Sequence, residues 1–429
     1  MEPKKFLFYS YEGLIGDIVW QIKKEGNEVK YYIKDRDERE VTDGFVEKVD
    51  DFKSHIDWAD VIVFDDTLGQ GEMAQKLREQ GKLVIGGTPY TDKLEDDRAF
   101  GQEEMKKHGI SILPYKQFTS FDEAMQYVKD NPGRYVIKPN GEASNIKGLL
   151  FIGEEEDGRD VIDVLEDYKV AWEKKIPEFQ LQKRVSGVEI AVSAFFNGKE
   201  FLNPININFE HKKLFPGNLG PNTGEMGTSI FWSTPNRLFN QTLKKLEATL
   251  AKEKYVGAID LNCIVNGYGI YPLEFTARFG YPIIMIMQDS MITPIGELLY
   301  EMAKGNGKNF KVKNGFHIGV RIVVPPFPFH DKQTFNAKSK DSVIFLKKTV
   351  EGIHIEDVKK INEQWVVTGT AGVVLVVCGS GMTMRQAIDN AYHKIKFIKI
   401  PHMYYRDDIG ERWFEDSDRL HSWGYLREL

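Results

Sequence analysis

The chain has 429 residues, of which 41% are hydrophobic and 28% charged, and its formal net charge is −7. This length predicts two or three domains with enough chain to bury a core. The acidic balance argues against a nucleic-acid partner, which needs a concentrated Lys/Arg face. No apolar run approaches the roughly 18 residues of a membrane helix, and the N-terminal apolar run is too short for a signal peptide. We therefore expect no membrane partner and a cytoplasmic location.

The first part of the chain, residues 1–92, alternates short apolar runs with amphipathic segments. The apolar runs predict buried strands at 5–10, 29–34, 60–66 and 82–87, and the segments between them have helical spacing and end at glycine. Strands that alternate with helices favour a small parallel α/β sheet. We predict an N-terminal parallel α/β domain.

The central part, residues 93–308, opens with a predicted helix over 94–110 whose acidic residues precede its basic ones, as a helix dipole favours. Strands are expected at 115–118, around 134–153 and over 179–209, with helices over 122–130 and 235–253. Residues 256–278 predict a β-hairpin that turns at Asn266-Gly267. Cys263, in this hairpin, and Cys378 lie in apolar runs without a disulfide framework, so we expect reduced core thiols.

The last part, residues 309–429, mixes strand-like runs with a helix over 383–398, with which the predicted elements end. Together the three parts predict an α/β protein, α+β overall, in three domains.

Lys138 lies on an apolar strand that leads into a polar loop, and Lys147 follows at the end of that loop. A lysine on a rigid strand and a second lysine on a covering loop suit a nucleoside triphosphate. The loop is not a Walker A sequence. The alternative interpretation is a hairpin with a solvated lysine.

The hairpin at 256–278 carries polar side chains on one face of each strand. Asp260 and Asn262 share a face of the first strand, and Glu274, Thr276 and Arg278 share a face of the second. Oxygen ligands beside an arginine predict a Mg²⁺-phosphate site. A surface hairpin with an alternating polar face is the alternative.

Four segments together carry a family resemblance: LEDDRAF…KKHGI (94–110), RYVIKPNG (134–141), EHKKLFPGNLGPNTGEMG (210–227) and LEFTARFG (273–280). In these the chain resembles the glycinamide ribonucleotide synthetase (phosphoribosylamine–glycine ligase) family of the ATP-grasp superfamily, over about residues 85–415. YYRDDIGER (404–412) is a weaker match. The resemblance implies an ATP-grasp fold and a ligase that joins a small carboxylate to an amine through an acyl phosphate, with ATP and Mg²⁺ or Mn²⁺.

Site residues follow from the same resemblance at matching positions. It implies ATP contacts from Arg98, Lys138, Lys147, the 180–185 strand with Lys183 and Val185, and Glu189. It implies metal ligands at Glu274, Asn262 and Thr276, and catalytic roles for Arg278 and Lys138. It implies an acceptor-substrate site formed by His211, Lys212, Gly220, Pro221, Asn222, Thr223, Gly224, Glu225 and Arg278. His211 could instead be a polar turn residue.

The departures from the family pattern gather on the acceptor side. The family's phosphoribosyl-binding elements are replaced by FYSYEGLIGDIVW (8–20) and FDDTLGQGE (64–72), and two family acids are absent at 281–283. Glu225 stands where the family has glycine, which predicts a more cationic or more polar acceptor. We therefore expect a ligase with an altered acceptor, such as a nucleotide-derived amine. The alternatives are a divergent phosphoribosylamine–glycine ligase of purine biosynthesis and a catalytically silent ATP-binding or regulatory protein.

Overall fold

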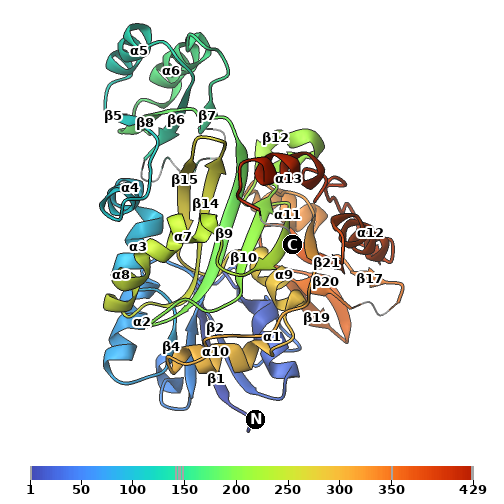
Figure 1. Ribbon diagram of the computed structural model, residues 1–429. Helices are drawn as coiled ribbons and strands as arrows, with labels where there is room; N and C mark the ends of the chain where they lie inside the picture. The colour runs from blue at the N-terminus through green and yellow to red at the C-terminus, as the bar shows by residue number, and fades with distance from the viewer. Residues whose placement is uncertain (1, 141–142, 144–145, 147–148, 349–350, 427–429) are drawn as a thin grey trace.

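The computed structural model describes residues 2–140, 143, 146, 149–348 and 351–426. Its N-terminal part is a four-stranded parallel sheet in the order β2-β1-β3-β4, drawn in blue at the base of Figure 1. The strands and their helices are β1 (Lys5–Ser10), α1 (Gly16–Lys24), β2 (Glu28–Ile33), η1 (Lys53–His55), β3 (Val61–Phe64), α2 (Gln70–Glu79) and β4 (Val84–Ile85). The predicted parallel α/β organisation is confirmed, because each apolar run forms a buried strand.

Two helices, α3 (Pro89–Asp96) and α4 (Arg98–Lys107), occupy the segment predicted as one helix over 94–110. That prediction was wrong about continuity. Asp97 has extended backbone angles, φ −111° and ψ 95°, and its carboxylate accepts a hydrogen bond from the N–H of Phe100 at 3.1 Å. The aspartate therefore caps the second helix and does not continue the first. Glu95, Asp96 and Arg98, on either side of this break, line the same cleft.

A small lobe stands away from the body of the molecule at the top of Figure 1. It is an antiparallel sheet in the order β5-β8-β6-β7, packed against two helices through a core that includes Phe121 and Phe179, whose rings stack at 4.8 Å. Its elements are β5 (Tyr115–Phe118), α5 (Phe121–Asp130), β6 (Tyr135–Pro139), β7 (Phe151–Ile152), α6 (Arg159–Trp172) and β8 (Phe179–Lys183).

The main sheet has eight antiparallel strands in the order β15-β14-β9-β10-β13-β16-β21-β18. These are β9 (Val188–Asn197), β10 (Ile205–Glu210), β13 (Gly227–Ser233), β14 (Val256–Val265), β15 (Ile270–Thr276), β16 (Phe316–Val323), β18 (Ile353–Ile355) and β21 (Val373–Gly381). One sheet thus takes strands from both sides of residue 308, so the predicted central and C-terminal parts share a core.

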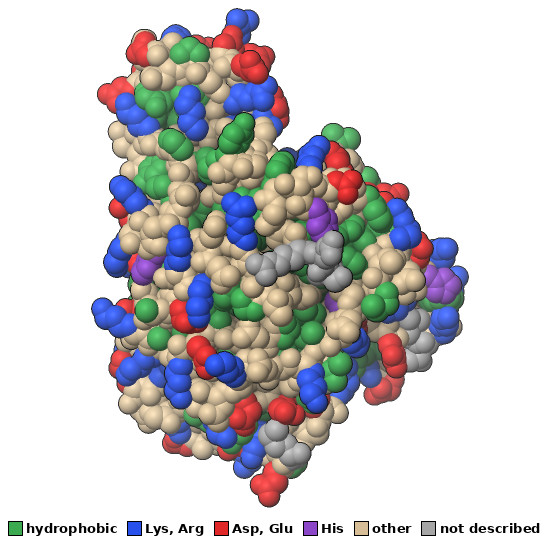
Figure 2. Space-filling view, viewed as in Figure 1, with side chains coloured by type: hydrophobic (Ala, Val, Ile, Leu, Met, Phe, Trp, Pro, Cys, Tyr) green, Lys and Arg blue, Asp and Glu red, His purple; other side chains and the backbone are tan. Residues whose placement is uncertain are grey.

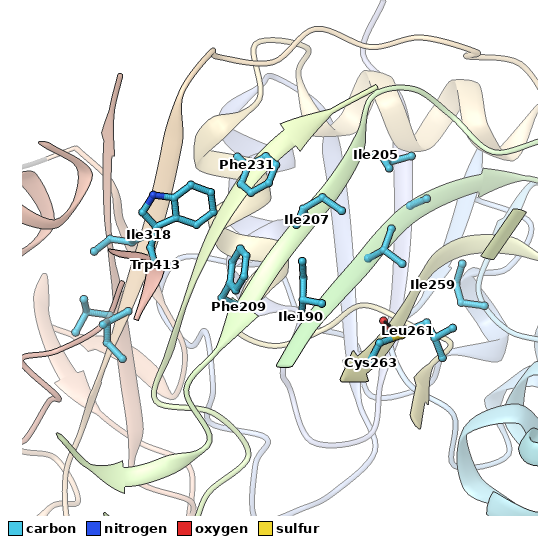
Figure 3. Close-up of a cluster of buried hydrophobic side chains, with 14 of the residues drawn as sticks. Ile190, Ile205, Ile207, Phe209, Phe231, Ile259, Leu261, Cys263, Ile318 and Trp413 are labelled. Atoms are coloured by element: carbon cyan, nitrogen blue, oxygen red, sulfur yellow. Dashed lines mark hydrogen bonds between the residues drawn. The ribbon is translucent and has the colours of Figure 1, made fainter. Parts of the chain in front are cut away.

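That core is apolar over most of the sheet (Figure 3). Ile207, Phe209 and Phe231 project from neighbouring strands, and Trp413 packs edge-on against the last two rings at 5.5 and 5.6 Å. Cys263 lies in the same cluster, and both cysteines are buried and free, as predicted. The core fixes the register of the strands that carry the polar site residues.

The remaining elements lie outside this sheet. The segment predicted as one helix over 235–253 is broken at Thr242, whose φ and ψ are −127° and −101°, into α7 (Arg237–Gln241), η4 (Leu243–Leu246) and α8 (Glu247–Lys252). A further helix, α13, follows the helix with which the predicted elements ended. The other elements are β11 (Lys213–Phe215), η3 (Pro216–Asn218), β12 (Leu219–Asn222), α9 (Ile283–Ser290), α10 (Ile295–Ala303), α11 (Lys332–Lys338), β17 (Phe345–Leu346), β19 (Val358–Ile361), β20 (Gln364–Val367), α12 (Met384–Ile395), β22 (Ile398–Lys399) and α13 (Trp413–Ser422).

Charged side chains of both signs are interspersed over the face seen in Figure 2. Within the described ranges, none of the helices is both long enough and apolar enough to span a bilayer.

Candidate active site

A cleft of about 810 Å³ lies where the small lobe, α3–α4 and the β14–β15 hairpin meet. Its wall brings together segments that are far apart in the chain: residues 94–105, 139–140, 210–212, 224–225, 260, 273–278 and 280–283. Several predicted site residues are among these, namely Arg98, Lys212, Gly224, Glu225, Glu274, Thr276 and Arg278. The predicted hairpin forms as expected, with Asn262 opposite Glu274 and Asp260 opposite Thr276.

Lys212 lies at the centre of three carboxylates. Its Nζ is 2.9 Å from Oε1 of Glu274, 3.2 Å from Oε1 of Glu189 and 3.3 Å from Oε2 of Glu210. These contacts raise the pKa of Lys212 well above its ordinary value although burial opposes the shift, and Lys212 lowers the pKa of Glu274 to about 2. Both groups are therefore charged at neutral pH.

Asn262 completes this cluster. Its Nδ2 donates to Glu189 at 3.1 Å and to Glu210 at 3.0 Å, while its Oδ1 is buried without a hydrogen-bond partner among the described residues. An unsatisfied buried oxygen costs free energy unless a ligand completes it. The free oxygen of Asn262 and the carboxylate of Glu274 lie on adjacent strands.

The segment at 404–412 holds the chain around Lys212 in place. Arg406 donates to the carbonyl of Lys213 at 2.8 Å, and Arg412 donates to the carbonyls of Glu189 at 2.9 Å and Glu210 at 3.2 Å. Arg406 is almost fully buried and also forms a salt bridge with Asp408. The C-terminal segment thus fixes the backbone from which the site's charged side chains project.

Lys138 is the buried cation of the small lobe, on β6 opposite Gln180 of β8, with only 8% of its surface exposed. Burial lowers the pKa of Lys138 to about 8, and the neighbouring charges of Arg98 and Lys212 act in the same direction. Arg98 Nη1 donates to the carbonyl of Pro139 at 3.3 Å, which places a second cation beside this strand. An anion brought between them would relieve the repulsion.

The other residues predicted to contact ATP do not line the described part of the cleft. Lys183 ends β8 and lies 4.1 Å from the ring of Tyr135, and Val185 follows it on a half-buried turn. Neither belongs to the described lining of the cleft, whereas Gln117 and Glu178 of the same lobe do. Lys147 lies outside the described residues.

The glycine-rich segment divides into two parts. Gly220, Pro221 and Asn222 lie on β12, in a short hairpin with β11, and are not part of the described cleft wall. Thr223 anchors the segment, since its hydroxyl donates to the carbonyl of Lys212 at 2.9 Å. Gly224 and Glu225 then turn back into the cleft wall.

His211 is buried, with 3% of its surface exposed, and lies outside the described lining of the cleft. Its two ring nitrogens have no hydrogen-bond partner among the described residues. Burial, together with Arg412 and Arg406, lowers its pKa to about 3, so the imidazole is neutral. His211 is therefore buried beneath the cleft surface, whereas the neighbouring Lys212 lines the cleft.

Arg278 occupies the other end of the cleft, just beyond β15. Its Nε is 3.1 Å from both Asp66 Oδ1 and Glu95 Oε1, and its Nη1 donates to the carbonyl of Phe279 at 2.8 Å. Sequence reasoning missed Asp66 and Glu95 as site residues. Asp66 is the second residue after the parallel strand β3. The carboxyl ends of such strands are where ligands bind in α/β sheets, so that signal was present.

The comparisons with known proteins agree with this geometry. Residues 96–283 match the family model described as phosphoribosylglycinamide synthetase, ATP-grasp (A) domain. This segment is similar to the ATP-grasp domain of that family. The match contains Lys138, Glu189, Lys212, Glu274 and Arg278, which the resemblance had singled out.

Relatives extend the similarity beyond the ATP-grasp domain. The chain is 25% identical over 365 residues to phosphoribosylamine–glycine ligase of Clostridium acetobutylicum, covering 79% of this chain and 81% of that protein. The crystal structure of phosphoribosylamine–glycine ligase from Thermotoga maritima has a TM-score of 0.70 at 23% identity, covering 94% of this chain and all of that one. The biotin carboxylase domain of Hydrogenobacter thermophilus 2-oxoglutarate carboxylase, solved with MgADP and bicarbonate, has a TM-score of 0.60 at 14% identity, covering 99% of each chain. The predicted ATP-grasp fold is confirmed.

The residues of the cleft fit a Mg-nucleotide. Arg98 in the cleft wall and Lys138 on the strand beside it supply the cations. Glu274 in the wall and the free Oδ1 of Asn262, opposite Glu274 on β14, supply hard oxygen donors. Within the described residues no three His, Cys, Asp or Glu side chains are grouped to hold a metal by themselves. Mg²⁺ in such sites is commonly held by one or two carboxylates and by substrate phosphates, so this donor set is adequate. Thr276, two residues after Glu274 on β15, adds a hydroxyl.

Proposed function

We propose that this protein is an ATP-dependent carboxylate–amine ligase that forms an amide through an acyl phosphate, with an acceptor site altered from that of phosphoribosylamine–glycine ligase. The proposal rests on one observation above all. Arg98, Lys212, Glu274 and Arg278 line a single cleft. Lys138 lies close enough to Arg98, Lys212 and Glu274 for their charges to act on its pKa, and Asn262 is paired with Glu274 across the β14–β15 hairpin. No covalent nucleophile is needed, because positioning and charge neutralisation carry such a reaction.

The proposed roles follow the charges. Lys138 and Arg98 bind the phosphates of ATP, with Lys147 as a further proposed phosphate ligand. Lys183, Val185 and Glu189 are proposed at the adenosine end. Mg²⁺ held by Glu274, Asn262 and Thr276 would offset the negative charge of the phosphates.

Two bond exchanges make up the reaction. A carboxylate oxygen of a small acid such as glycine bonds to the γ-phosphorus, and the bond from that phosphorus to ADP breaks. The free amine of the acceptor then bonds to the acyl carbon and loses a proton. The bond from that carbon to the bridging oxygen breaks, and the oxygen leaves as part of inorganic phosphate. Arg278, at the end of β15, is placed to stabilise the charged acyl phosphate.

The test is the trapping of the activated acid by hydroxylamine, which does not depend on the natural acceptor. We expect Mg-ATP, hydroxylamine and one member of a panel of amino acids to give a hydroxamate with stoichiometric release of ADP. ATP binding without hydroxamate or ADP from any acid would refute the ligase and leave a silent ATP-binding protein.

A second candidate is a divergent but genuine phosphoribosylamine–glycine ligase, favoured by the family match over residues 96–283. It predicts ADP release that depends on glycine together with phosphoribosylamine. Turnover with that pair above all others would establish it and would overturn the altered acceptor site.

A further inference from the structure

The wall of the cleft is rich in carboxylates. The described lining of the whole cleft contains the acids Glu95, Asp96, Asp97, Glu178, Glu210, Glu225, Asp260 and Glu274, against the cations Arg98, Lys212 and Arg278. Asp66 lies directly behind this wall in contact with Arg278. Burial raises the pKa of Glu95 and Asp260 to about 7 and that of Glu225 well above its ordinary value, so a bound cation would favour the ionised form of these acids.

Two of the cations in the cleft wall are already paired with carboxylates. Arg278 contacts Asp66 and Glu95 and donates to the carbonyl of Phe279. Lys212 contacts Glu189, Glu210 and Glu274. A phosphate carried by the acceptor would have to compete for these cations with the carboxylates and with the acyl phosphate proposed beside Arg278.

The environment of Glu225 is a second indication of a bound ligand, independent of how many acids line the cleft. Only 4% of its surface is exposed, it belongs to the cleft wall, and its Oε1 has no hydrogen-bond partner among the described residues. The nearby Arg321 does not satisfy it, since that guanidinium donates to both carboxylate oxygens of Glu356 and to the backbone carbonyl of Glu225. A buried carboxylate oxygen that faces a cleft without a partner is completed by a donor on a bound molecule.

The carboxyl ends of the N-terminal parallel strands carry further acids on the side of Arg278 away from the cleft lining. Asp65 and Asp66 follow β3, and Ser10, the last residue of β1, donates to Asp65 at 2.5 Å. Glu12, just after β1, faces Asp66 and Arg278. The edge of the sheet at which α/β proteins bind ligands is thus acidic here.

We infer that the acceptor is a phosphate-free amine that carries a second positive charge, such as a diamine or a polyamine, and that its distal ammonium binds at Glu225. This inference rests on the proposed ligase activity and names the substrate class of the same site. One amine nitrogen loses its proton and bonds to the acyl carbon, and phosphate leaves. The distal ammonium keeps its proton and only binds. A nucleotide-derived acceptor is disfavoured by the same wall.

The experiment compares acceptors after the hydroxylamine assay has identified the acid. ADP release is measured with that acid and Mg-ATP plus putrescine, spermidine, the monoamine ethanolamine, phosphoribosylamine generated in solution, or an aminoimidazole ribonucleotide. We expect putrescine or spermidine to have a kcat/KM at least about tenfold above the others, as one charge-assisted hydrogen bond provides. A preference for either phosphorylated amine, with hydroxamate still formed, overturns the inference and leaves the ligase standing. Absence of hydroxamate refutes both.

A pair of variants locates the charge that is responsible. Glu225→Gln removes one negative charge at nearly constant shape, and we expect the KM for the dication to rise about tenfold or more while that for ethanolamine changes little. Glu166→Gln, on the exposed face of α6, is the matched control and should behave as wild type. Calorimetric binding of spermidine to folded wild type and Glu225→Gln provides a readout without turnover. Equal affinity for the two proteins would overturn the assignment of Glu225.

Discussion

The ammonium of Lys212 lies 2.9 Å from the carboxylate of Glu274, with Glu189 and Glu210 within 3.3 Å on its other sides. A lysine from the segment after β10 thus neutralises a carboxylate on β15 and two more from β9 and β10. Each of the three carboxylates would repel the others without it. The same carboxylate of Glu274 is 58% exposed to the cleft, so it can also meet a bound metal nucleotide.

Substituting Lys212 tests its role in holding the acids together. Lys212→Met should lower the free energy of unfolding by about 1–3 kcal/mol, because three partly desolvated carboxylates lose their common cation. Urea unfolding at pH 7 measures the loss. Lys213→Met, at the neighbouring position, is the control and should change stability by less than about 0.5 kcal/mol. An equal loss in both variants would contradict the central role of Lys212.

Removing the charge of Glu274 should affect turnover more than folding. For Glu274→Gln we expect kcat for hydroxamate formation to fall about hundredfold or more, as the loss of a group that positions transition-state charge does. Glu166→Gln should retain wild-type kcat. Raising the Mg²⁺ concentration should recover part of the Glu274→Gln activity if the carboxylate binds the metal. Full activity in Glu274→Gln at ordinary Mg²⁺ would exclude that role.

The charge of Lys138 gives ATP binding a pH dependence. Burial, with Arg98 and Lys212, lowers the pKa of Lys138 to about 8, so its charged fraction falls as the pH rises above that value. The Kd for ATP should therefore rise between pH 7 and 9.5, by up to about tenfold for each pH unit beyond the pKa. Calorimetric titration at each pH measures the Kd. Lys138→Arg, which stays charged, should bind with a much shallower dependence, and an unchanged slope in that variant would assign the effect elsewhere.

His354 joins the N-terminal and C-terminal parts of the chain by a buried ion pair. Its Nδ1 is 2.7 Å from Oδ2 of Asp17 on α1, and its Nε2 is 3.5 Å from Asp289 on α9. Although burial opposes it, the charge of Asp17 together with other nearby groups raises the pKa of His354 well above the usual 6.5. A raised folded-state pKa means that this stabilisation is fully present below pH 6.5 and is lost as the pH rises through the higher folded value.

The corresponding variant should lose stability in a pH-dependent way. We expect His354→Gln to lower the free energy of unfolding by about 3 kcal/mol at pH 6, because Asp17 is left buried without its partner. The difference from wild type should shrink as the pH is raised into the alkaline range. Urea unfolding across that range measures it. A difference that stays constant with pH would show that the charge of His354 contributes nothing.

Local sequence was sufficient for much of this site. The alternation of side chains along a strand puts Asp260 and Asn262 on one face of β14 and Glu274 and Thr276 on one face of β15. Which residues oppose one another depends also on a register shift between Asn262 and Cys263, which the Asn266-Gly267 turn did not predict. Lys138 was likewise predicted from its apolar strand. The one continuous helix predicted over 94–110 failed at Asp97, where capping of α4 outweighed the helical pattern.

Tertiary structure alone decided which charges meet. The sequence contains Lys212, Arg278, Asp66 and Glu225, but their pairing depends on loops that return to the sheet from distant parts of the chain. It also decided that His211, next to Lys212, is buried behind the wall with neutral nitrogens. Propensity and periodicity act over a few residues, whereas a salt bridge such as Arg278–Asp66 depends on how two separately folded segments pack. The sequence by itself therefore predicted individual site residues such as Lys138, Glu225 and Glu274, and only the packing decided which charged groups each of them meets.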